Sequence, residues 1–115
     1  MKTQAPLRYF SSRGVIGTLS RMADGGKSLK DIGRRIAALR RVMKMNKTAF
    51  AELIGVSQPA VSQYENGVRR PELDVAQRIR MRTGVTLDWI YEGDRSGLSL
   101  RWANELPDLS GRQAG

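Results

Sequence analysis

The feature that most constrains the fold is the short segment Gly55-Val56-Ser57, where one helical pattern ends and another begins. A glycine directly after an apolar helical pattern supplies the positive φ with which many helices end. Ser57 is a typical residue before a helix, since its hydroxyl can accept from unpaired N–H groups, and Pro59 fits the first turn, where a missing N–H costs nothing. So short a connection makes the two helices cross. The segment therefore predicts a helix-turn-helix pair at about residues 47–66.

An amphipathic helix precedes the pair, and we expect Asp31 to be its N-cap. Apolar residues recur there at i, i+4, i+7 and i+11, which places them on one helical face: Ile32, Ile36, Leu39 and Met43. The other sides carry cations that we expect to face solvent: Arg34, Arg35, Arg41 and Lys44. Within the pair, Asn46 can cap the first helix, and the inward positions are Phe50, Leu53, Ile54, Val61 and Tyr64.

Two more helices are predicted after the pair. One covers residues 71–83 and is closed by a glycine, with its buried positions at Leu73, Ala76 and Ile79. The other covers residues 87–92, is capped by Thr86, and carries the apolar residues Trp89 and Ile90. No stretch alternates apolar and polar residues as a strand would. The sequence predicts an all-α domain of about five short helices over residues 31–94, a length that can fold alone.

The composition excludes several classes of function. The 115 residues include no Cys and no His, so disulfides, thiolate metal sites, cysteine nucleophiles and the most common general base are absent. We therefore expect no metal, no cofactor and no enzymatic activity. No apolar run approaches the roughly 20 residues that cross a bilayer. The 20 basic residues exceed the 11 acidic ones, and the net charge of +9 favours a polyanionic partner, above all nucleic acid.

The positive charge is unevenly distributed along the chain. Residues 1–30 carry a net +5, residues 31–94 a net +3 and residues 95–115 a net +1. The first segment is rich in Ser, Gly, Arg and Lys without a sustained period, which predicts a flexible basic N-terminal extension with one short ordered stretch around residues 15–22. Its Arg- and Ser-rich start is also typical of an organelle transit peptide. The last segment is predicted to be a tail that holds one short helix, at residues 99–106, before a disordered end.

The middle segment resembles the Cro/C1-type helix-turn-helix family, also called the XRE or lambda-repressor-like family. The resemblance covers residues 32–93 and is carried by NKTAFAELIGVSQPAVSQYENG followed by RRPELDVAQRIRMRTGVTLDWIYEGD. Its most specific parts are the Gly-Val-Ser turn, the stretch that ends in Tyr-Glu-Asn-Gly, and the Gly-Val-Thr-Leu-Asp-Trp ending. Two positions depart from the family pattern, because Arg80 replaces a small apolar residue and Thr83 replaces a Leu. We expect Arg80 to extend its charge into water.

The resemblance implies that the second helix of the pair enters the major groove of DNA, with its N-terminal residues against the base edges. Gln58 and Gln63 project outward if the apolar residues of that helix point inward, and a Gln amide can pair with N6 and N7 of adenine. Pro59 and Ala60 are apolar neighbours that can contact a thymine methyl group. These four residues form the predicted base-reading set. The alternative is that both glutamines are only solvated helix surface.

Phosphate contacts position a protein without reading sequence, and the residues predicted to make them are Asn46, Lys47, Ser57, Ser62, Asn66, Arg69 and Arg70. The residues at helix starts benefit from the positive end of the helix dipole. Asn46 and Asn66 match phosphate-binding positions of the family. For Ser57 the helix cap comes first, and Arg69 and Arg70 have the alternative role of a solubility charge pair.

The family resemblance also implies a structural ion pair between the first helix and the end of the recognition helix. Arg40 and Glu65 occupy the two positions. A partly buried pair would fix the recognition helix against the rest of the domain. The alternative is a solvated pair that contributes less than about 1 kcal/mol.

The resemblance implies a sequence-specific regulator of transcription that binds double-stranded DNA, with repression as the expected role. We expect it to be of bacterial or phage origin and to act in the bacterial cytoplasm. A homodimer on a palindromic operator presents its two recognition helices about 34 Å apart. One alternative is a protein-interaction module, an antitoxin or adaptor that uses residues 1–30 or 95–115 to hold a partner and also binds DNA. Another is a membrane-surface or imported protein that uses the basic extension.

Overall fold

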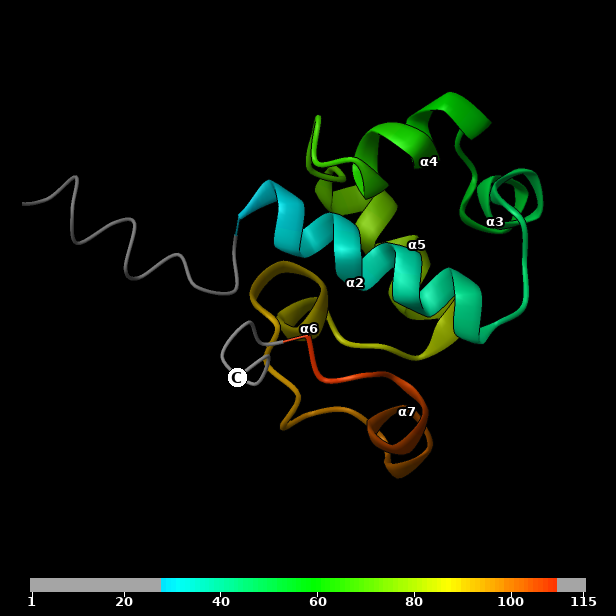
Figure 1. The fold of residues 1–115 in the computed structure, drawn as a ribbon. Helices are drawn as coiled ribbons and strands as arrows, with labels where there is room; N and C mark the ends of the chain where they lie inside the picture. The colour runs from blue at the N-terminus through cyan, green and yellow to red at the C-terminus, as the bar shows by residue number, and fades with distance from the viewer. Residues whose placement is uncertain (1–27, 110–115) are drawn as a thin grey trace, which may run out of the picture.

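A computed structural model describes residues 28–109, and all regular secondary structure within this range is α-helical (Figure 1). The helices are α2 (Leu29–Val42), α3 (Lys47–Ile54), α4 (Gln58–Glu65), α5 (Leu73–Thr83), α6 (Leu87–Glu92) and α7 (Leu100–Glu105). The prediction of an all-α, helix-turn-helix fold is confirmed. The N-terminal extension before Ser28, with the ordered stretch predicted in it, lies outside the described residues, as does the end of the tail.

The three-residue turn between α3 and α4 forms as its residue types require. Gly55 ends α3 with φ 75°, and its N–H donates to the carbonyl of Ala51. The Ser57 hydroxyl accepts from the N–H of Ala60 at 3.2 Å, which starts α4. At the other end of α3, the Asn46 side chain accepts from the N–H of Ala49 at 2.8 Å. Each boundary of the pair is thus set by a local hydrogen bond.

Two helix starts differ from the sequence prediction. The first helix begins at Leu29, because the Ser28 hydroxyl accepts from the N–H of Asp31 at 3.0 Å and is the N-cap. Asp31 lies in the first turn instead, where its charge suits the helix dipole. The helix predicted to open at residue 71 begins at Leu73, with Glu72 as N-cap. Leu73 is 56% exposed rather than buried, since Val75, Ala76 and Ile79 form the inner face of α5.

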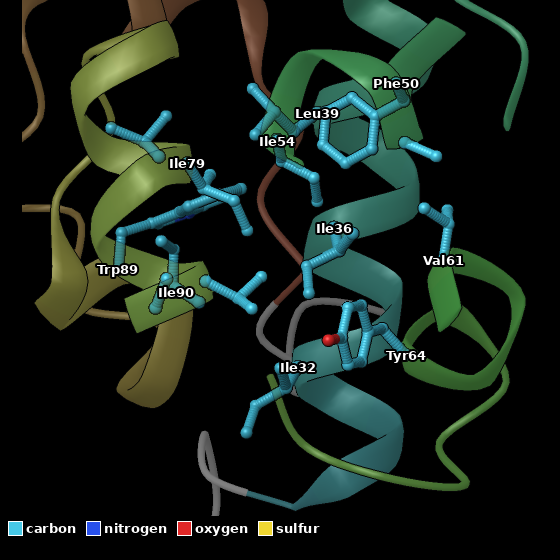
Figure 2. Packing of buried hydrophobic residues seen from close by; sticks show 14 of the residues in the cluster. Ile32, Ile36, Leu39, Phe50, Ile54, Val61, Tyr64, Ile79, Trp89 and Ile90 are labelled. Carbon is cyan, nitrogen blue, oxygen red and sulfur yellow. The ribbon is translucent and has the colours of Figure 1, made fainter. Parts of the chain in front are cut away.

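The hydrophobic core surrounds α2, which lies between two groups of helices (Figure 2). Ile36 of α2 has Val61 and Tyr64 of α4 on one side, and residues of α5 and α6 such as Ile79 and Ile90 on the other. All five side chains are fully buried. Because α2 contributes to both halves, the position of α4 depends on how closely it packs against α2.

That packing is closest at Gly33. A Cβ atom at this position would lie 2.4 Å from the carbonyl oxygen of Tyr64 and 2.5 Å from that of Glu65. Only a glycine therefore lets the backbones of α2 and α4 approach so closely.

An ion pair joins the same two helices near the end of α4. The Arg40 Nε lies 2.6 Å from Oε2 of Glu65, and Arg40 Nη2 lies 3.0 Å from Oε1. Arg40 Nη1 also donates to the carbonyl of Met45 at 3.1 Å. The side chain of Glu65 is only 6% exposed and that of Arg40 13%. This fork-like geometry fixes the direction of α4 and raises the pKa of Arg40, chiefly through its hydrogen bond to Glu65.

Arg35 is buried, contrary to the expectation that it faces solvent. Its Nε and Nη2 donate to the carbonyl of Ile90 at 3.1 and 3.0 Å, and the side chain is 4% exposed. That carbonyl belongs to the last turn of α6, where helical partners are missing. Burial lowers the pKa of Arg35. Gly93 (φ 78°) makes room for the arginine, since a Cβ there would lie 2.9 Å from Arg35 Nη1. Arg80, in contrast, is exposed as expected.

The C-terminal segment folds onto the domain. α7 occupies the predicted position, and its Trp102 and Leu106 are 3% exposed members of the core. The Trp102 indole donates to the carbonyl of Thr83 at 2.8 Å. Arg95 donates to the carbonyls of Ala103 and Leu106 at 2.9 and 3.1 Å. Residues 95–106 are therefore part of the folded unit. No helix within residues 28–109 is long and apolar enough to cross a membrane.

The ion pair gives a first prediction. Glu65→Ala removes the partner of a largely buried Arg40, so we expect a loss of about 3 kcal/mol in the free energy of unfolding, measured by urea denaturation. Glu52→Ala is the matched control, because Glu52 is an exposed acid on the neighbouring helix, and we expect it to change stability by less than about 0.5 kcal/mol. Equal effects of the two substitutions would contradict a structural role for the pair.

The close approach at Gly33 gives a second prediction. Gly33→Ala forces α2 and α4 apart, which we expect to cost about 3 kcal/mol, the upper end for overpacking. Gly97→Ala is the control, since a Cβ at Gly97 makes an ordinary contact of 3.5 Å with a methyl group of Thr86. Thermal unfolding of the two variants measures the difference. If Gly33→Ala is as stable as Gly97→Ala, the close approach of α2 and α4 does not require a glycine at position 33.

Candidate nucleic-acid interface

Helix α4 presents one polar side to solvent. Gln58, Pro59 and Gln63 are exposed, whereas Val61 and Tyr64 are fully buried. The helix is anchored by its apolar side and by the ion pair at its end, so the exposed side faces outward. Figure 1 shows α4 on the side of the domain opposite α7.

Ala60 differs from its predicted position. It is 8% exposed and belongs to the core cluster. Residues four apart share a helical face, so Ala60 lies on the buried side with Tyr64. A methyl group in this position cannot lie along a base edge, and we remove Ala60 from the base-reading set.

Ser62 links the start of α3 with the start of α4. Its hydroxyl oxygen accepts from Nε2 of Gln58 at 3.1 Å and from Nζ of Lys47 at 3.3 Å. The predicted base-reading Gln58 and the predicted phosphate ligands Lys47 and Ser62 are therefore in direct contact. A side chain suited to a base edge and side chains suited to a phosphate are therefore neighbours at this end of α4.

The helix caps account for part of the predicted phosphate set. Asn46 uses its side-chain oxygen to cap α3, so the donor half of its amide is the group suited to a phosphate. The Ser57 hydroxyl accepts from a backbone N–H and can still donate its own hydrogen. Asn66 is exposed at the C-cap of α4.

The loop after α4 holds Arg69 in a polar cluster. Its Nη1 donates to Oε1 of Gln63 at 3.1 Å, and its Nη2 donates to Oε2 of Glu72 at 2.7 Å. The other oxygen of Glu72 accepts from the hydroxyl of the buried Tyr64 at 3.1 Å. Hydrogen bonds from its own backbone and then from Arg69 lower the pKa of Glu72. The charge of Arg69 is thus paired with an anion. The adjacent Arg70 is exposed.

A hollow of about 350 Å³ lies between α2 and the C-terminal segment. Its walls include Ala37, Arg41, Lys47, Asn66 and Pro107. Arg41 thus lies near two residues predicted to contact phosphate. Arg41 was expected on the solvent side of its helix and was not among the predicted site residues. Only the packing of α2 beside α3 and α4 brings it there.

Comparisons with known proteins agree with this geometry. Residues 36–90 match a family model described as helix-turn-helix, and this range runs from α2 through α6. Comparisons with curated proteins and with solved structures gave no significant match. The matched range contains the α3–α4 pair, its three-residue turn and the core that holds α4. Residues 36–90 are thus a helix-turn-helix domain of the Cro/C1 (XRE) type, and the all-helical structure is consistent with the lambda-repressor-like fold.

Proposed function

We propose that the protein is a sequence-specific regulator of transcription that represses its target by occupying an operator in double-stranded DNA. The observation that carries this proposal is the polar side of α4, where Gln58, Pro59 and Gln63 are exposed on a helix whose other side is locked into the core. A helix held in this way fits the major groove, and Gln amides can pair with base edges there. Such a protein acts in the cytoplasm, where the DNA is.

The flanking polar residues fit contacts with the DNA backbone. The proposed phosphate ligands are Asn46, Lys47, Ser57, Ser62, Asn66 and Arg70. Asn46, Lys47 and Ser57 lie at the starts of α3 and α4, and Ser62 lies within α4. Asn66 is at the end of α4 and Arg70 is in the loop that follows. Helix starts and cations of this kind bind phosphate oxygens and set the register of the protein on the duplex.

We also propose that the protein binds as a homodimer. Two copies related by a two-fold axis place their α4 helices in successive major grooves, about 34 Å apart, and so read a palindromic operator. The surplus of positive charge, of which residues 1–30 carry +5, adds affinity that does not depend on sequence and falls with salt. In this proposal the basic extension strengthens binding, and the folded domain, residues 31–94 at least, selects the site.

The packing of the C-terminal segment reduces the surface through which an antitoxin or adaptor could hold a partner. Trp102 and Leu106 are buried in the domain's own core, and Arg95 holds the segment by its carbonyls. Residues 100–106 are therefore occupied by an internal contact rather than available to wrap a partner. A partner that binds through this tail would have to displace them, so the alternative depends mainly on residues 1–30.

In vitro selection of bound DNA from a random pool tests the proposal. We expect the wild-type protein to enrich a palindromic consensus whose half-sites are one helical turn apart. A pool without enrichment would overturn sequence-specific binding and favour the interaction module.

Two substitutions separate base reading from phosphate contact. Gln58→Ala should relax the preference at one base position and leave the salt dependence unchanged. Arg70→Ala should weaken binding to all sequences alike and reduce the slope of log affinity against log salt by about one. Fluorescence anisotropy on the consensus and on single-base variants, over a range of salt, measures both. Identical behaviour of the two variants would contradict the assignment of Gln58 to base reading and of Arg70 to phosphate contact.

A further inference from the structure

The exposed Gln63 is connected to the protein core by a chain of side-chain hydrogen bonds. The chain runs from the buried hydroxyl of Tyr64 to Glu72, from Glu72 to Arg69, and from Arg69 to Oε1 of Gln63. The guanidinium also lies over the Tyr64 ring, with its carbon 5.2 Å from the ring centroid. We propose that Arg69 is a positioning residue, which fixes the amide of Gln63 and thereby sets which bases α4 accepts. This inference rests on the proposed function.

The orientation of the Gln63 amide follows from the chemistry of its partner. A guanidinium group has five N–H donors and no acceptor. The atom of Gln63 that faces Arg69 Nη1 at 3.1 Å is therefore the carbonyl oxygen. The amide NH₂ is then turned away from Arg69, toward the exposed side of α4.

The backbone of the loop keeps Arg69 within reach of Gln63. The N–H groups of Val68 and Arg69 both donate to the backbone carbonyl of Gln63, at 2.9 and 3.4 Å. Gly67 allows this reversal with its φ of 74°. The loop thus folds back on the helix, and both the main chain and the side chain of Arg69 hold the same residue.

Glu72 holds the other arm of the guanidinium. Its carboxylate is bound on one oxygen by Arg69 and on the other by the hydroxyl of Tyr64. Because the pKa of Glu72 is lowered, the carboxylate stays ionised at neutral pH. Arg69 is thus held by Gln63 on one side and by Glu72 on the other, and the carboxylate of Glu72 balances its charge. Arg69 is therefore less suited to hold a phosphate, in contrast to the expectation from sequence.

A fixed amide changes the expected base preference. Bidentate pairing with adenine needs the amide oxygen to accept from N6 while the NH₂ donates to N7. When the oxygen faces Arg69, the NH₂ group meets the base. Guanine offers two neighbouring acceptors, O6 and N7, and thymine offers O4. Adenine offers only N7, beside an N6 amino group that repels a second donor, and thymine likewise offers a single acceptor. We therefore expect Gln63 to favour guanine over adenine at its position in the operator.

Selection from the same random pool, with four variants, tests this assignment. Gln63→Ala identifies the operator position that this residue reads. Arg69→Ala and Arg69→Lys should both reduce the preference for guanine over adenine at that position by about five- to tenfold, the loss expected for one amide–base contact. Lysine keeps the charge but lacks the planar fork that reaches Gln63 and Glu72 together. Arg70→Ala is the matched control and should keep the preference.

The salt slope distinguishes positioning from phosphate binding. Arg69→Ala should keep the wild-type slope, while Arg70→Ala lowers it by about one. Thermal unfolding confirms that each variant is folded. An unchanged preference in both Arg69 variants, or a slope in Arg69→Ala reduced as much as in Arg70→Ala, would overturn the inference alone. The absence of any wild-type consensus would overturn the proposed function itself.

Discussion

The direct packing of α2 against α4 is the contact on which the rest of the structure depends. At Gly33 the two backbones approach so closely that a single methyl group would collide with two carbonyl oxygens. One face of α2 then fits against Val61 and Tyr64, and Arg40 binds Glu65 where α4 ends. A helix held along its side and at its end has little freedom to tilt. The exposed glutamines of α4 therefore keep a fixed direction relative to α3.

Local chemistry made most of the fold predictable from sequence. Asn46, Ser57 and Thr86 are N-caps, because each side chain accepts from an unpaired backbone N–H in the first turn of its helix. Glycines such as Gly55 end helices because they adopt a positive φ without strain. Hydrophobic spacing identified the inner faces for the same reason. The start of α5 was predicted two residues too early, since Pro71 suits the residues before a helix as well as its first turn.

What the sequence could not show are contacts between residues far apart in the chain. Arg35 was assigned to solvent by its place on the helix, but its partner is a carbonyl 55 residues away. Trp102 looked like part of an isolated tail until the packing of α7 placed its indole on Thr83. Ala60 was assigned to the DNA side by its neighbours, whereas its helical phase places it in the core. The errors at Arg35 and Trp102 have one cause, because local pattern does not specify which surface meets which. The error at Ala60 is different, since the helical phase of α4 already indicates its inward position.

The two glutamines of α4 are each held by a residue outside the proposed base-reading set, and this bears on the proposed recognition of DNA by α4. Gln58 is bound to Ser62, which also accepts from Lys47, and Gln63 is bound to Arg69. Free glutamine side chains lose rotamer freedom when they bind, and the loss opposes affinity. Side chains that are already ordered lose less. Two cations near α4 therefore restrain the exposed glutamines: Arg69 binds Gln63 directly, and Lys47 binds the hydroxyl of Ser62 that also holds Gln58.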